Sequence, residues 1–94
     1  MKMPGSDRYT IAYLQSVVKD DIKALPKTIK IAVKKAVETR LAIDPVGFGK
    51  PLRYSLKGHR RLRVGDYRIV YRIEVVKKRV VIVAIKHRKS VYKP

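Results

Sequence analysis

Cysteine is absent from the 94 residues of the chain, which excludes disulfide bonds, thiolate catalysis and cysteine-ligated zinc. Long apolar runs are absent as well: the longest, Val80–Ile85, has six residues, whereas a membrane-spanning helix needs about 20. The first residues, Met1–Ser6, lack the apolar stretch of a secretory signal peptide. These absences predict a cytoplasmic protein that does not span a membrane, with a flexible lead-in over residues 1–7.

Acidic residues are scarce, with 7 Asp and Glu against 24 Lys and Arg, so the net charge is +17. The excess is uneven. Residues 1–49 hold nine basic and five acidic side chains, whereas residues 50–94 hold fifteen and two. Self-repulsion on this scale destabilises a compact fold, so we expect a polyanionic partner. Nucleic acid is the first candidate, and an anionic membrane surface or a merely basic exterior are the alternatives.

The length of 94 residues predicts a single domain. A hydrophobic fraction of 46% is enough for a small core. A chain this short leaves no room for a large enzyme core with a deep interior site. Any chemistry must therefore take place on an open face or in a shallow cleft.

The first half of the chain reads as one strand followed by two helices. Arg8–Leu14 is rich in aromatic and β-branched residues and predicts a strand. Ser16 is placed to cap the first helix, and Pro26 starts a second, amphipathic helix of about four turns. Asp44, which precedes a proline, ends it. Val46–Pro51, with two glycines, is predicted to be a loop.

The second half reads as three strands, Arg60–Val64, Tyr67–Glu74 and Arg79–Lys86. The order β-α-α-β-β-β predicts an α+β fold. We expect a small, twisted, mostly antiparallel sheet with the two-helix hairpin packed on one face. The other face would then be partly open.

A two-residue turn, Gly65-Asp66, joins the first two of these strands, and a leading glycine suits a type II′ turn. Its length predicts three cross-strand pairs: Val64 with Tyr67, Arg63 with Arg68, and Arg61 with Val70. Because side chains alternate across a sheet, Arg61, Arg63 and Arg68 share one face. Arg72 extends this stripe. Arginines held side by side favour bidentate phosphate binding, and the alternative is that they simply extend into solvent.

The tail carries a second cluster, in which His87, Arg88 and Tyr92 combine a proton carrier, a charge and a ring that can stack on a base. If the last strand delivers this tail beside the arginine stripe, the two clusters together could serve phosphoryl chemistry. Alternatively, His87 is only part of the exposed polar surface, and Tyr92 packs on the edge of the sheet.

Two segments of this half, Arg61–Tyr71 (RLRVGDYRIVY) and Ile85–Tyr92 (IKHRKSVY), resemble the RelE/ParE toxin superfamily of toxin–antitoxin systems, in particular its RelE-like branch of mRNA interferases. Lys23–Pro26 and Leu41–Pro45 match the two-helix pattern of that superfamily. The likeness extends from about Tyr9 to Tyr92.

The resemblance implies a toxin that cleaves mRNA in the ribosomal A site without a metal or other cofactor. The RNA 2′-OH attacks the adjacent phosphate and leaves a 2′,3′-cyclic phosphate and a 5′-OH. The implied partners are the ribosome, its mRNA and a cognate antitoxin, which forms a heterodimeric or heterotetrameric complex with the toxin. No membrane is implied.

Site residues follow from the same resemblance. Arg68 would hold the scissile phosphate, Arg88 the leaving group or transition-state charge, and Tyr92 the mRNA base. The full predicted catalytic set is Arg61, Arg63, Arg68, His87, Arg88 and Tyr92. Further RNA contacts are predicted at Arg60, Arg72, Lys86 and Lys89.

The chain departs from the RelE pattern at Arg61 and Arg63, where lysines are expected. Arginine, unlike lysine, is not deprotonated in proteins and cannot act as a base. Either His87 or Tyr92 then supplies the base, or catalysis is mostly electrostatic. Two other functions remain open: ParE-like inhibition of DNA gyrase, and a non-catalytic RNA-binding module.

Overall fold

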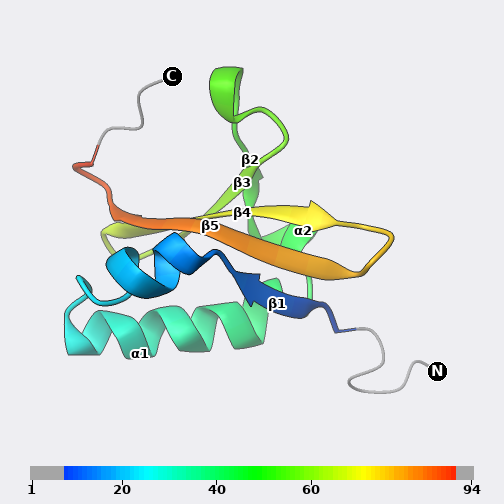
Figure 1. Ribbon diagram of the computed structural model, residues 1–94. Helices are drawn as coiled ribbons and strands as arrows, with labels where there is room; N and C mark the ends of the chain where they lie inside the picture. Colours follow the sequence, from blue (N-terminus) through cyan, green and yellow to red (C-terminus); the bar gives the residue numbers. More distant parts are fainter. Residues whose placement is uncertain (1–7, 91–94) are drawn as a thin grey trace.

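The structure, a computed structural model, describes residues 8–90. Five strands form one sheet in the order β1-β5-β4-β3-β2 (Figure 1). The strands are β1 (Thr10–Tyr13), β2 (Lys50–Pro51), β3 (Arg60–Val64), β4 (Tyr67–Glu74) and β5 (Arg79–His87). β1 runs parallel to β5, and the other neighbours are antiparallel. This confirms the predicted α+β fold and its mostly antiparallel sheet.

Helical segments cover one face of the sheet (Figure 1). A π-helical turn, η1 (Val17–Asp21), precedes α1 (Lys27–Ala36), which continues into a second π-helical turn, η2 (Val37–Leu41). The start of α1 directly after Pro26 agrees with the prediction. Ser16, however, makes no side-chain capping hydrogen bond, because its backbone is already helical. Among the described residues, no helix combines the length and the apolar character needed to cross a bilayer.

The segment Val46–Pro51 is not the loop that we predicted. It contains most of a short helix, α2 (Pro45–Phe48), and the two-residue strand β2. The carboxylate of Asp44 caps α2 by accepting the backbone N–H of Gly47 at 2.9 Å. β2 then pairs with β3 through Lys50 and Arg61. A tertiary pairing of only two residues leaves no periodic signal in the sequence.

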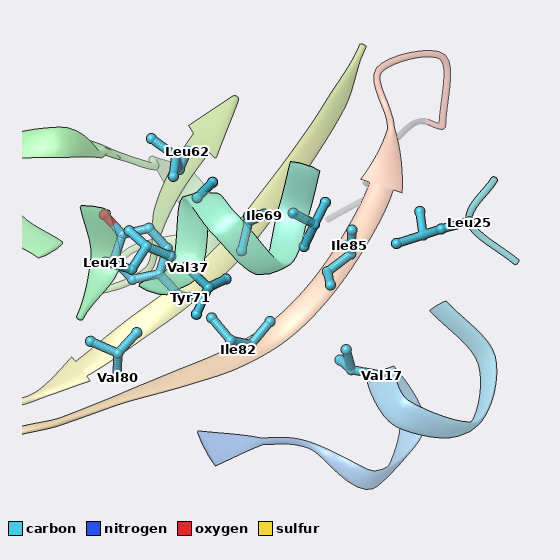
Figure 2. Packing of buried hydrophobic residues seen from close by; sticks show 12 residues of the cluster. Val17, Leu25, Val37, Leu41, Leu62, Ile69, Tyr71, Val80, Ile82 and Ile85 are labelled. Carbon is cyan, nitrogen blue, oxygen red and sulfur yellow. The ribbon is translucent and has the colours of Figure 1, made fainter. Parts of the chain in front are cut away.

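The core lies between the helical layer and the sheet (Figure 2). The apolar stripe predicted for the second helix supplies Val33, Val37 and Leu41, all of them buried. From the sheet, Leu62, Ile69, Tyr71, Val80, Ile82 and Ile85 point into the same layer. The residues between them on β3 and β4 therefore face the opposite side of the sheet, which the helical segments do not cover (Figure 1) and where Val70 is nonetheless buried.

The β3–β4 hairpin has the predicted register. Val64 pairs with Tyr67, Arg63 with Arg68, and Arg61 with Val70. Gly65 has a φ of 58°, the left-handed conformation that the first position of a type II′ turn requires. The register between β4 and β5 shifts near Val70, because Val70 pairs with Ala84 whereas Tyr71 pairs with Ile82.

Candidate nucleic-acid interface

A row of three basic residues crosses the uncovered face of the sheet. Arg63 on β3 lies opposite Arg68 on β4, and Arg68 lies opposite Lys86 on β5. Arg61 lies on the same face two residues before Arg63. The structure thus brings together four of the predicted site residues, from three strands, on a rigid surface.

Three of these charges are not neutralised by any residue that the structure describes. Within residues 8–90, neither Arg61 nor Arg63 nor Arg68 has an ion-pair partner. The Nε of Arg68 is buried and has no hydrogen-bond partner in that part of the chain. A buried N–H donor without an acceptor is costly. The terminal guanidinium nitrogens of the opposed Arg63 and Arg68 fit the oxygens of a phosphate.

Arg72 lies on the same face, but its charge is neutralised by an ion pair. Its Nη1 lies 2.7 Å from Oε2 of Glu74, and the Nε of Arg79 lies 2.6 Å from the other carboxylate oxygen. Hydrogen bonds from Arg72 and then from Arg79 hold the pKa of the Glu74 carboxyl below its ordinary value. Arg72 therefore ends the stripe in an ion-pair cluster rather than extending its free positive charge.

Lys86 is held by a residue that the sequence analysis did not single out. Its Nζ lies 2.8 Å from Oδ1 of Asp21, while Oδ2 of Asp21 accepts the backbone N–H of Ile85 at 2.8 Å. Asp21 is only 9% exposed. Its spacing of four residues from Val17 and from Leu25 places it on the buried side of a helical segment, and this carboxylate on an apolar stripe is the signal that could have revealed it.

Arg88 lies at the turn end of the hairpin. Its backbone N–H donates to the carbonyl of Asp66 at 2.6 Å. Its Nε lies 3.6 Å from Oδ1 of Asp66, in a pair whose two side chains are more than half exposed. Such an ion pair is weak. The Arg88 side chain is therefore free to turn from Asp66 toward an anion.

His87 lies on the other side of the sheet from the arginine stripe. It pairs with Tyr67, and the two rings meet edge to face at 5.1 Å. Its Nδ1 accepts the backbone N–H of Lys89 at 3.1 Å. Our grouping of His87 with the arginines therefore needs correction. β5 is apolar throughout and shifts register, so the face of its last residues could not be counted from the sequence.

Arg60 also lies apart from the predicted RNA-contacting group. It pairs with the buried Tyr71 across the β3–β4 ladder. Its Nη2 donates to the carbonyl oxygens of Val46 and Gly49, at 2.8 and 3.0 Å. Arg60 thus anchors α2 to the sheet and lies on the opposite face from Arg61 and Arg63. Lys89 follows β5 and is exposed, and Tyr92 lies outside the described residues.

Within residues 8–90, helical segments thus lie on one face of the sheet (Figure 1), and Arg61, Arg63 and Arg68, which have no ion-pair partner there, lie on the other. Over residues 13–92 the sequence matches the family described as the ParE toxin of type II toxin–antitoxin systems. The chain belongs to this family, within the RelE/ParE toxin superfamily.

Among individual proteins, the chain is similar to toxin RelG of Mycobacterium tuberculosis, with 35% identity over 97% of this chain and 99% of the relative. Toxin RelE of the same organism is 36% identical over 97% of this chain and 93% of its own length. The structure is also similar to that of the M. tuberculosis toxin–antitoxin complex RelBE2, with a TM-score of 0.80, 35% identity and coverage of 88% and 94%. Isolated E. coli RelE shares the fold, with a TM-score of 0.71 at 16% identity and coverage of 88% and 87%.

Proposed function

We propose that this toxin is a ribosome-dependent endoribonuclease that cleaves mRNA on the arginine face of its sheet. The observation that carries the proposal is the opposed pair Arg63 and Arg68, neither of which has an ion-pair partner within residues 8–90. The named likeness to RelG and RelE toxins supports it. The RNA-cleaving function that the sequence resemblance implies needs such an anion site.

In this mechanism the 2′-OH of one nucleotide attacks the phosphorus that joins it to the next. The 2′-OH releases its proton to water, the bond to the 5′ oxygen breaks, and that oxygen takes up a proton from water, so the products are a 2′,3′-cyclic phosphate and a 5′-OH. The non-bridging oxygens gain negative charge in the transition state. Arg63 and Arg68 hold these oxygens from a fixed strand pair, so the stabilising charge is in place before reaction.

Arg88 completes the set in our proposal. Arg88 lies beyond β5, beside the hairpin turn, where it forms a weak ion pair with Asp66. When RNA binds, its guanidinium group leaves Asp66 and contacts the leaving 5′ oxygen. Tyr92 is proposed to stack on the mRNA base. His87 faces away from the arginines, so we assign it the role of fixing the end of β5, and catalysis is then mainly electrostatic.

The test is a map of mRNA 5′ ends after brief expression of the protein and of its Arg68→Ala variant. We expect new 5′-OH ends at fixed positions within translated codons, lost in the variant while ribosome binding persists. Lys77→Ala, in the β4–β5 turn, is the matched control and should cleave like the wild type. Intact mRNA in cells that express folded wild-type protein would reject the proposal.

The second candidate function is ParE-like inhibition of DNA gyrase, which the match to the ParE family favours. Under this alternative, expression arrests growth and induces DNA damage while mRNA stays intact. The same experiment therefore separates the two functions.

We also propose a cognate antitoxin. The net charge of +17 favours an acidic partner, and several structures with this fold are toxin–antitoxin complexes. Co-purification of an acidic small protein from the native locus, in a heterodimeric or heterotetrameric complex, is the expected result. Recovery of the toxin alone from native expression would contradict it.

A further inference from the structure

Residues 52–59 form an arm between β2 and β3 that stands away from the sheet (Figure 1). The backbone N–H of Leu52 donates to the carbonyl of His59 at 2.9 Å and closes the base of the arm. At its tip lies the single turn η3 (Tyr54–Leu56), in which the N–H of Lys57 donates to the carbonyl of Tyr54 at 2.9 Å. The arm therefore presents its side chains on a folded backbone.

Tyr54 is the outstanding feature of this arm. Its side chain is 86% exposed, although it is a large aromatic residue. Its φ of 59° lies in the left-handed region, which favours glycine and is strained for a tyrosine. Neither burial nor backbone preference accounts for a tyrosine here. A conformational outlier of this kind points to a function of the side chain.

The stretch of sequence that contains Tyr54 is strongly basic. Between Asp44 and Asp66 the chain has six Lys and Arg residues and no Asp or Glu. Lys50 pairs with Arg61 across the β2–β3 ladder, so the arm joins the arginine face directly. Beside this junction, a hollow of about 270 Å³ is lined by Phe48, Lys50, Arg61, Leu62 and Arg63. Phe48 in this hollow is 49% exposed.

We propose that this aromatic and basic surface, which comprises Phe48, Lys50, Arg53, Tyr54 and Lys57, binds a single-stranded segment of RNA. An exposed ring among cations suits an unpaired base together with its phosphates. Tyr54 stacks on the base, and Lys50 and Arg53 contact the backbone. An acidic protein would use the charges but gives no reason for a strained, exposed ring. The inference rests on the proposed function only in that the partner is RNA, and it requires no cleavage.

The chain has no tryptophan, which makes a direct test available. Tyr54→Trp introduces one fluorophore at the tip of the arm, and stacking of a base on it should quench the emission. The probe is a single-stranded 2′-O-methyl oligonucleotide of about eight nucleotides, in the range of known single-strand sites. Its blocked 2′ oxygen cannot attack the phosphate. Val76→Trp, in the exposed β4–β5 turn, is the matched control and should not be quenched.

The affinity for this oligonucleotide distinguishes the contribution of the Tyr54 ring from that of the neighbouring basic charges. We expect Tyr54→Phe to bind the same oligonucleotide like the wild type and Tyr54→Gly to bind about tenfold more weakly, the usual scale for loss of one base stack. Glycine suits the φ of Tyr54, so this variant should melt no lower than the wild type, and a folding defect cannot explain weaker binding.

Unquenched emission of Tyr54→Trp, or unchanged affinity of Tyr54→Gly, would overturn the proposal even if mRNA is cleaved in cells. So would a loss of affinity for an acidic partner protein with RNA affinity intact. Conversely, intact mRNA in cells together with a quenched Tyr54→Trp would reject the nuclease function and leave the RNA-binding arm standing.

Discussion

Arg63 lies directly opposite Arg68 in the β3–β4 ladder, in one row with Lys86 on β5. Like charges directly opposite each other destabilise a sheet by about 0.2–1 kcal/mol. Lys86 is paired with Asp21, whereas the two arginines have no ion-pair partner within residues 8–90. An oxyanion bound between the two guanidinium groups would relieve the repulsion.

The first prediction is therefore that phosphate stabilises the free toxin. At low ionic strength, phosphate should raise the melting temperature by several degrees over chloride at equal ionic strength, because it binds the folded state. Arg68→Gln should remove most of this gain and also melt higher than the wild type without phosphate. Lys77→Gln serves as the control for lost charge and should retain the gain. An equal response of Arg68→Gln and wild type would contradict an anion site at this pair.

The register of this row was predictable because a two-residue turn fixes it locally. Gly65 selects the turn, and the turn sets every pair of the hairpin. The position of Arg60 was not predictable in the same way. Its role depends on α2 and β2, which form through a cap at Asp44 and a two-residue pairing with β3. His87 was misplaced because β5 is apolar on both faces and shifts register.

The second prediction concerns Asp21, whose carboxylate accepts a backbone N–H of β5 beyond the end of the neighbouring strand β1. Asp21→Ala leaves the buried N–H of Ile85 without its acceptor and breaks the pair with Lys86. We expect a loss of about 2–3 kcal/mol in the free energy of unfolding, and about half of that for Asp21→Asn, whose amide oxygen still accepts the N–H.

Denaturant unfolding measures the loss in the free energy of unfolding, and amide hydrogen exchange shows which part of the structure is destabilised. The Ile85 amide should exchange faster in Asp21→Ala than in the wild type. Asp20→Ala, at the exposed neighbouring carboxylate, is the control and should change both measurements little. Equal effects of Asp20→Ala and Asp21→Ala would show that the negative charge of this segment stabilises the fold, and not the hydrogen bond from Ile85 to Asp21.

The third prediction is that Glu74 contributes to the loss of stability of the protein at acidic pH. Hydrogen bonds from Arg72 and Arg79 lower the pKa of this carboxyl in the folded state. The folded protein therefore releases its proton more readily than the unfolded chain. The stabilisation is fully present above the ordinary carboxyl pKa and is lost as the pH falls through the lowered value. Melting temperatures measured from about pH 6 down to pH 3 should fall less steeply for Glu74→Gln than for the wild type.

The fourth prediction concerns the close approach of Gly49 to Tyr71. The hydroxyl of the buried Tyr71 donates to the carbonyl of Pro45, and a Cβ at Gly49 would collide with that hydroxyl and lie 2.9 Å from the carbonyl oxygen of Arg61. Gly49→Ala should therefore cost about 3 kcal/mol, and Tyr71→Phe about 1–2 kcal/mol through the lost hydrogen bond.

A double-mutant cycle by denaturant unfolding tests this relationship. Tyr71→Phe removes the nearest atom that the new methyl group would meet and leaves the ring carbon Cζ at 2.8 Å, so the double variant should be less destabilised than the sum of the singles, by about 1 kcal/mol. Strict additivity would mean that the ring of Tyr71 or the carbonyl of Arg61, not the Tyr71 hydroxyl, limits the space at Gly49.

The last prediction separates His87 from the arginines in the proposed cleavage reaction. The His87 ring packs on Tyr67 on the helix-covered face, and its Nδ1 accepts the N–H of Lys89. If it fixes the end of β5 rather than moving a proton, His87→Gln should slow cleavage of ribosome-bound mRNA by about tenfold or less. Arg68→Ala should slow it by about a hundredfold or more, as expected when a transition-state charge is lost.

The dependence of the cleavage rate on pH gives the sharper distinction. A positioning role leaves the shape of the profile between about pH 6 and pH 9 unchanged in His87→Gln, whereas removal of a general base flattens its acidic limb. Tyr67→Leu, which removes the ring that His87 packs against, should reproduce the modest loss without touching either nitrogen of the imidazole. A flattened profile in His87→Gln, with Tyr67→Leu fully active, would instead establish His87 as the base. The tail would then have to move across the end of the sheet when RNA binds.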